Sequence, residues 1–175
     1  MMTNKKTIAA VSGSAGLESS NTALLEALKN HFKSNYNMEI YTGLRELPLF
    51  TPDKLEHPTA EVKKWKDTLS RADAVIFCTP EYSHNIPAVL KNGLEWITQS
   101  GELSNKRVLP VTFTPKEPRG EFAMQSLLFT LQTLKAQIVS QMPLYRNEVE
   151  YENRKITLNA DYKMIWEEAL EVLVG

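Results

Sequence analysis

Serine hydroxyls are concentrated in the stretch Ser12–Asn21, SGSAGLESSN, which follows an apolar segment and opens a helical one. Hydroxyls and free N–H groups at a helix N-terminus are typical of an anion site. The stretch lacks the glycine spacing of the dinucleotide fingerprint and the Gly-Lys-Ser/Thr of a P-loop, so it favours a phosphomonoester over a nucleoside triphosphate. The alternative is a flexible loop in which Ser19 or Ser20 only caps the helix.

A second candidate site lies in Thr79–Ile97, TPEYSHNIPAVLKNGLEWI, where an apolar strand ends in a proline and a tyrosine. A helix then begins without a glycine-rich turn. We interpret the Pro80–Ser83 turn as a platform for a ligand, to which Tyr82 presents an apolar face with a polar tip. Plain core packing is the alternative for Tyr82, and it is the interpretation that we favour for Trp96.

The remaining reactive side chains near this turn have ordinary explanations. Cys78 lies inside an apolar run and is interpreted as a small buried hydrophobe rather than a nucleophile. His84 either hydrogen-bonds a substrate or is a solvent-exposed loop residue, and Glu81 either pairs with a cation or contacts a partner subunit. We assign no catalytic residue and no metal ligand, because the three histidines are scattered and no Cys/His cluster exists.

Length and composition narrow the class of protein. The 175 residues are enough for one domain spanning 1–175, and the net charge of −1 gives no electrostatic footprint for nucleic acid or an anionic membrane. No apolar run approaches the length of a membrane span or a signal-peptide core. The single cysteine cannot form an internal disulfide, so we expect a cytoplasmic protein.

Hydrophobic periodicity predicts five strands and five helices that alternate along the chain. Polar loops separate them, including a long one over Thr42–His57 and a surface excursion, with a possible hairpin, over Asn147–Asn159. Pro110 argues for a sheet edge or a bulge in the fourth strand. The predicted strands are Thr7–Ser12, Met38–Tyr41, Ala72–Cys78, Arg107–Phe113 and Gln137–Met142; the predicted helices are Ser20–Phe32, Thr59–Leu69, Ile86–Thr98, Gly120–Lys135 and Ala160–Leu173.

This alternation predicts a parallel sheet with helices on both faces. Ligands of such folds bind outside the carboxyl ends of the strands, at the point where the strand order reverses. The loops that follow the first, third and fourth predicted strands are therefore the candidate site, and the third of these loops is Thr112–Glu121.

Two motifs make the chain resemble the NADPH-dependent FMN reductase family, which includes quinone, chromate and azo-dye reductases. The family's P-E-Y-N-x-S-x-P-x-x-L-K-N-x-x-D/E-W is matched at Pro80, Glu81, Tyr82, Pro87, Leu90, Lys91, Asn92, Glu95 and Trp96. Its G-S-x-R-x-x-S-x-N loop is matched at Gly13, Ser14, Ser19 and Asn21. The family's arginine is Gly16 here, and its glycine-rich third loop is TFTPKEPRGE, in which Arg119 is a candidate replacement for the missing cation.

The resemblance implies a flavodoxin-like three-layer sandwich with a five-stranded parallel sheet in the order 2-1-3-4-5. It also implies FMN as cofactor, with the backbone N–H groups of the Pro80–Ser83 turn facing the flavin ring. The implied cofactor-binding residues are Ser12, Ser14, Ser19, Ser20, Asn21, Pro80, Glu81, Tyr82, Ser83, Thr114 and Arg119.

The implied activity is an FMN-dependent NAD(P)H oxidoreductase. A hydride passes from NADPH or NADH to flavin N5, and electrons then pass to a quinone, flavin or similar small acceptor by ping-pong exchange. The altered loops leave open an alternative, a flavin-binding or electron-carrier protein without its own NAD(P)H activity. The resemblance further implies a homodimer with active sites near the subunit interface.

Overall fold

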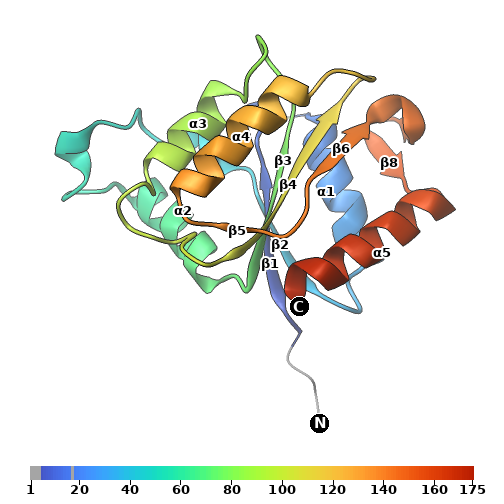
Figure 1. Ribbon diagram of the computed structural model, residues 1–175, viewed down its shortest axis with the longest axis horizontal. Coiled ribbons are helices and arrows are strands. Elements are labelled where there is room, and N and C mark those ends of the chain that lie inside the picture. Colours follow the sequence, from blue (N-terminus) through green and yellow to red (C-terminus); the bar gives the residue numbers. More distant parts are fainter. Residues whose placement is uncertain (1–4, 17) are drawn as a thin grey trace.

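The computed structural model describes residues 5–16 and 18–175. A parallel sheet runs through the middle of the fold in the order β2-β1-β3-β4-β5, which is the predicted order (Figure 1). Its first four strands are β1 (Thr7–Ser12), β2 (Asn37–Tyr41), β3 (Ala74–Thr79) and β4 (Arg107–Thr114). The fifth position holds two short segments, β5 (Gln137–Ile138) and β6 (Met142–Tyr145), and both pair with β4.

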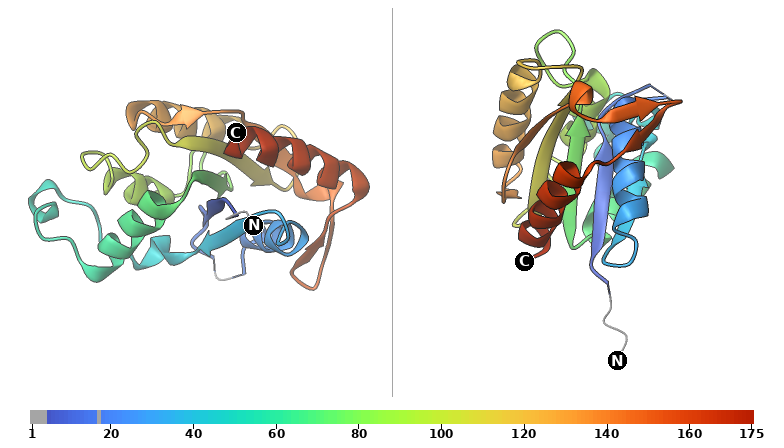
Figure 2. Two further views of the ribbon diagram at one scale, coloured as in Figure 1. Left: turned by 90° about the horizontal axis from the view of Figure 1, so that it is seen from below. Right: turned by 90° about the vertical axis from the view of Figure 1, so that its right-hand side faces the viewer.

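Helices cover both faces of this sheet (Figure 2). The helices α1 (Ser20–His31) and α5 (Ala160–Val174) pack on one face. The other face is covered by α2 (Ala60–Arg71), α3 (Ala88–Glu95) and α4 (Glu121–Thr133). Alternate side chains of a strand point to opposite faces, so in β1 Ile8 and Ala10 join one core while Ala9 and Val11 join the other.

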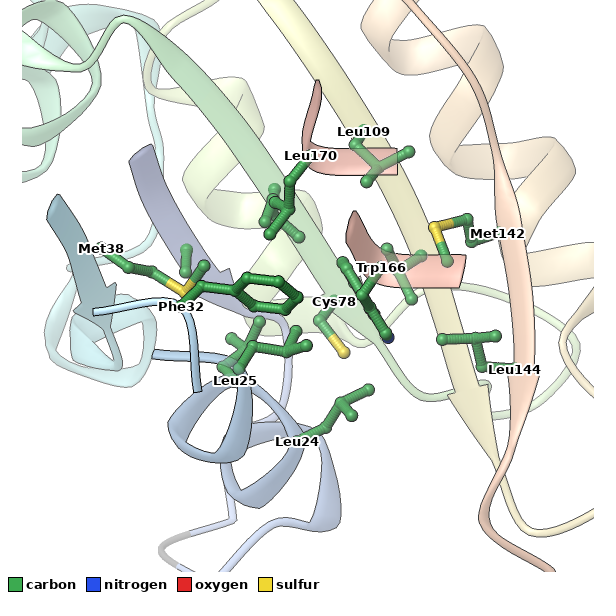
Figure 3. Close-up of a cluster of buried hydrophobic side chains, with 14 of the residues drawn as sticks. Leu24, Leu25, Phe32, Met38, Cys78, Leu109, Met142, Leu144, Trp166 and Leu170 are labelled. Atoms are coloured by element: carbon green, nitrogen blue, oxygen red, sulfur yellow. The ribbon is translucent and has the colours of Figure 1, made fainter. Parts of the chain in front are cut away.

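The core between the sheet, α1 and α5 is drawn in Figure 3. Leu24 and Leu25 of α1 and Trp166 and Leu170 of α5 surround Cys78 of β3, and all five are fully buried. The buried face of α5 is formed by Tyr162, Trp166, Leu170 and Leu173, whereas Ile165 is 43% exposed.

The prediction of one continuous fifth strand over Gln137–Met142 was wrong. Val108 of β4 pairs with Ile138, and Val111 pairs with Met142. The segment of β4 between these two pairs is therefore one residue shorter than the facing segment of its partner. The extra residue makes a bulge opposite Pro110, which has no N–H to donate there. The prediction of an edge or a bulge in the fourth strand was therefore wrong: β4 is an interior strand whose register with β3 is unbroken at Pro110, and the extra residue lies on the neighbouring strand.

Short elements fill the two long connections. Two 3-10 helices, η1 (Gly43–Glu46) and η2 (Pro52–Lys54), lie in the loop between β2 and α2. After β6 come a third 3-10 helix, η3 (Arg146–Glu148), and the antiparallel hairpin of β7 (Glu150–Glu152) and β8 (Lys155–Thr157), as predicted. None of the helices within the described residues combines the length and apolar character needed to cross a bilayer.

Candidate functional site

The loops after β1, β3 and β4 meet at the carboxyl edge of the sheet. The Gly13 N–H donates to the carbonyl of Cys78 at 2.8 Å, which joins the first loop to β3. A Cβ on Gly13 would lie 2.9 Å from the side chain of Thr79 and 3.0 Å from Leu90. Because no larger residue fits between these side chains, glycine is required where the first loop crosses β3.

Hydroxyl groups organise the loop between β1 and α1. Ser19 caps α1 by accepting a hydrogen bond from the N–H of Asn21, as the sequence predicted for Ser19 or Ser20. Ser14 Oγ accepts from the N–H of Gly16, and Ser12 Oγ lies 2.8 Å from Thr22 Oγ1. Ser20 is the first residue of the helix.

The side chain of Asn21 is an internal anchor. It is buried, donates to the carbonyl of Phe113 on β4 at 3.2 Å and accepts from the Cys78 thiol of β3 at 3.2 Å. Burial raises the pKa of Cys78, so the thiol stays protonated and can donate. Asn21 therefore attaches the first turn of α1 to the middle of the sheet.

The turn after β3 closes on itself. Tyr82 and Asn85 exchange two backbone hydrogen bonds of 2.9 Å, and the residues between them, Ser83 and His84, have positive φ of 50° and 57°. The Tyr82 N–H is therefore occupied within the turn, and Pro80 has no N–H. Among the described residues, the N–H groups of Glu81, Ser83 and His84 make no hydrogen bond and are left to face a ligand or water. Tyr82 is 54% exposed, so it does not pack in the core.

Glu81 connects this turn to α4. One of its carboxylate oxygens accepts hydrogen bonds of 3.1 Å from the N–H groups of Gly120, Phe122 and Ala123, which form the first turn of α4. Only 6% of the Glu81 side chain is exposed. The charge is stabilised by three donors and by the positive end of the helix dipole.

The loop after β4 forms the far side of the site. Thr114 is buried, and its Oγ1 donates at 2.8 Å to the carbonyl of Arg119, which closes the exposed stretch 115–119. Gly120 then takes a φ of 109°, and a Cβ there would lie 2.9 Å from Thr112 Oγ1. That Thr112 oxygen is buried and has no hydrogen-bond partner among the described residues.

Two residues of the second motif hold the loop before η2, a role that the sequence did not reveal. Asn92 donates to the Pro48 carbonyl at 3.0 Å and accepts from the Phe50 N–H at 2.8 Å, and Trp96 Nε1 donates to Pro48 at 2.8 Å. Trp96 is fully buried, as favoured from the sequence. The sequence signal that could have indicated this role is a polar asparagine on the inner side of an amphipathic helix.

The structure brings most of the candidate residues to one edge but gives them different environments. Ser14 and Ser19 border the first loop, Tyr82 and Ser83 form the exposed turn, and Arg119 lies in an exposed loop. Ser12, Asn21, Pro80 and Thr114 are buried beneath these loops. A guanidinium from elsewhere also reaches the first loop, because Arg154, in the turn of the β7–β8 hairpin, forms an ion pair with Glu18.

Known proteins share the fold of this chain. A flavoenzyme NAD(P)H:(acceptor) oxidoreductase from Paracoccus denitrificans superposes with a TM-score of 0.77 over 96% of this chain and 95% of its own, at 20% identity. At that identity the likeness establishes the flavodoxin-like fold.

Curated relatives match about half of their own length. A subunit of an NADH:(hydroxy)cinnamate reductase from Vibrio ruber is 40% identical over 103 residues, 58% of this chain and 50% of that protein. A quinone reductase from Pseudomonas putida is 35% identical over 95 residues, 54% of this chain and 50% of that protein. The model of one family, the NADPH-dependent FMN reductases, matches residues 7–148, which include all three loops of the site. The chain therefore belongs to the NADPH-dependent FMN reductase family.

Proposed function

We propose that this protein is an FMN-dependent NAD(P)H oxidoreductase that reduces a quinone, a flavin or a similar small acceptor. The observation that carries the proposal is the convergence of both family motifs, at Gly13–Asn21 and Pro80–Trp96, on one edge of a flavodoxin-like sheet. The relatives named quinone reductase and (hydroxy)cinnamate reductase support a conjugated organic acceptor.

The first loop has the donors that a phosphate group requires. Among the described residues, the N–H groups of Ser14, Ala15 and Ser19 donate to no other protein group, and they lie just before the N-terminus of α1. The one carboxylate on the described part of this loop, Glu18, is paired with Arg154. We propose that Ser14, Ser19 and Ser20 hold the phosphate while Ser12 and Asn21 fix the loop from below.

The second and third loops, which follow β3 and β4, are suited to the flat ring. The Glu81 and Ser83 N–H groups lie on the exposed turn with the Tyr82 ring beside them, and Thr114 sets the position of the 115–119 loop through Arg119. We propose that the ring binds between these loops, with Pro80 as its buried support.

FMN, when bound, supplies a carrier that takes two electrons from NAD(P)H and passes them to the acceptor. The chain's own residues bind and orient the flavin, and N–H donors at the ring edge stabilise negative charge that develops there. In this proposal no side chain of the site needs to act as an acid or a nucleophile.

We also propose that the chain forms one domain over 1–175 and assembles as a homodimer. Both core clusters flank the same sheet, which supports one domain. Phe122 and Phe129 lie two turns apart on α4 and are 50% and 71% exposed, and His84 stacks edge-on against Phe122. A second copy covering these aromatic rings would remove them from water. Light scattering should give about 40 kDa, against 19.9 kDa for one chain.

The function is tested by an anaerobic absorbance spectrum of FMN-soaked, desalted protein, before and after NADPH and then NADH. We expect protein-bound flavin that bleaches and is reoxidised by added quinone. Flavin that stays bound and oxidised would favour the carrier alternative. Protein that retains no flavin would refute the proposal.

A further inference from the structure

Glu81 lies at the contact between two loops that come from different strands. It belongs to the turn after β3, whereas its three donors belong to the first turn of α4, about forty residues later in the chain. Figure 1 shows that turn beside the end of α4 at which the helix begins. The Glu81 carboxylate thus provides the hydrogen bonds between the two loops that flank the proposed ring site, and His84 adds an edge-on contact with Phe122.

The contact is built for a charged carboxylate. All three donors reach the same oxygen at 3.1 Å, and the side chain is nearly completely buried. Within the described residues, the basic side chain in ion-pair range of Glu81 is His84, whose Nδ1 lies 3.7 Å from the other oxygen and whose side chain is 76% exposed. The backbone of α4, rather than a salt bridge, is therefore the main partner of the charge.

No other hydrogen bond between described residues joins the turn 80–85 to the segment 115–123. The α4 N-terminus has no side-chain cap of its own, because Gly120 occupies the cap position. Without the Glu81 carboxylate, the first N–H groups of α4 would lose their acceptor and the exposed 115–119 loop would lose its attachment to the turn.

We propose that Glu81 is a positioning residue for the flavin ring: by capping α4 from the opposite loop, it holds the two sides of the ring site at a fixed separation. This inference rests on the proposed function and adds to it a role for a residue that touches no reacting atom. It predicts that loss of the Glu81 carboxylate weakens the binding of the flavin ring and leaves the binding of the phosphate unchanged.

The test compares Glu81→Ala and Glu81→Gln with the wild type. Binding of FMN and of riboflavin, which lacks the phosphate, is measured on folded protein. We expect Glu81→Ala to weaken both flavins by the same factor, about tenfold or more, and Glu81→Gln to lie between because it keeps an acceptor oxygen but not the charge. Glu102→Ala serves as the control and should bind both flavins like the wild type, because Glu102 lies at the opposite edge of the sheet and, within the described residues, its side chain accepts from Ser100 Oγ alone.

Small carboxylates give a more selective readout. In Glu81→Ala the three N–H groups surround a vacated anion position, so formate should restore flavin affinity, whereas sodium chloride at the same ionic strength should not. Formate should have no effect on the wild type or on Glu102→Ala.

Trypsin reports on the contact without any flavin, since Lys116 and Arg119 lie in the exposed loop that Glu81 attaches. We expect faster cleavage there in Glu81→Ala, and slower cleavage again with formate. Wild-type cleavage rates together with unchanged flavin affinities in Glu81→Ala would overturn the inference. So would a loss confined to FMN. Wild-type protein that binds no flavin would refute the proposed function and, with it, the role toward the ring, while the cleavage data would still show whether the contact exists.

Discussion

Replacement of the buried anchor Asn21 by alanine should destabilise the protein strongly. The change removes the hydrogen bond to the Phe113 carbonyl and the acceptor of the Cys78 thiol, both 3.2 Å long and both buried. A net loss of about 1 to 1.5 kcal/mol for the amide bond, and a similar amount for the unpaired groups and the small cavity, gives about 2 to 3 kcal/mol. For a chain of this size that corresponds to a fall in melting temperature of about 4 to 12 °C.

Urea unfolding of the protein without flavin measures this loss directly. Asn35→Ala is the matched control, because the Asn35 side chain is exposed and, among the described residues, accepts one hydrogen bond, from Ser34 Oγ; the variant should stay within about 0.5 kcal/mol of the wild type. Cys78→Ala, alone and combined with Asn21→Ala, isolates the thiol contact, and the pair should be non-additive. An Asn21→Ala protein as stable as Asn35→Ala would refute the view that this side chain anchors α1 to the sheet.

Three further outcomes follow from individual contacts. Asn92→Ala should detach the loop at Pro48, because it removes two hydrogen bonds; hydrogen exchange at the Phe50 N–H should then quicken about tenfold or more, and an unchanged rate would contradict the contact. The hydrogen bond from the Thr7 N–H to Asp73, with help from Lys6, lowers the pKa of that carboxyl, so its stabilising effect is present above about pH 4 and is lost as the pH falls through the folded-state pKa. Asp73→Asn should therefore be less stable than the wild type at neutral pH, and the difference in stability should shrink in acid. Thermal melts across that pH range would show this, and a stability difference that does not change with pH would contradict the role of the Asp73 charge. Burial raises the pKa of Cys78, so a thiol reagent should label it only after unfolding, and rapid labelling of native protein would disprove that state.

Much of the fold was predictable because the signals are local. Strands β1 and β3 are short apolar runs that are buried on both faces, and the helices between them show one-sided periodicity, so their order predicted a parallel sheet. The break in the fifth strand was not predictable from QIVSQM itself. It arises where this strand passes Pro110 of β4, and a pairing between strands is not contained in either sequence alone.

The same distinction holds for the site. Gly13–Asn21 and Pro80–Trp96 identified the loops, because their residue types and spacing match a family pattern and local capping, as at Ser19, depends on neighbours in the chain. For Glu81 the sequence suggested a cation or a partner subunit rather than the amides of α4, and for Asn92 it indicated no role. Glu81 lies far in sequence from Gly120, and Asn92 lies far from Pro48.

The sequence by itself therefore determined the parallel α/β architecture, the family and the loops that form the site, since these depend on burial patterns and on motifs read along the chain. Only the tertiary structure decided which polar groups face a ligand and which support the fold. Asn21 and Thr114 donate hydrogen bonds to backbone carbonyls, and Glu81 accepts hydrogen bonds from the amides of α4. Arg154 forms an ion pair with Glu18, which lies far from it in the sequence. A hydrogen-bonding group takes the nearest well-oriented partner in space, and chain folding sets that partner.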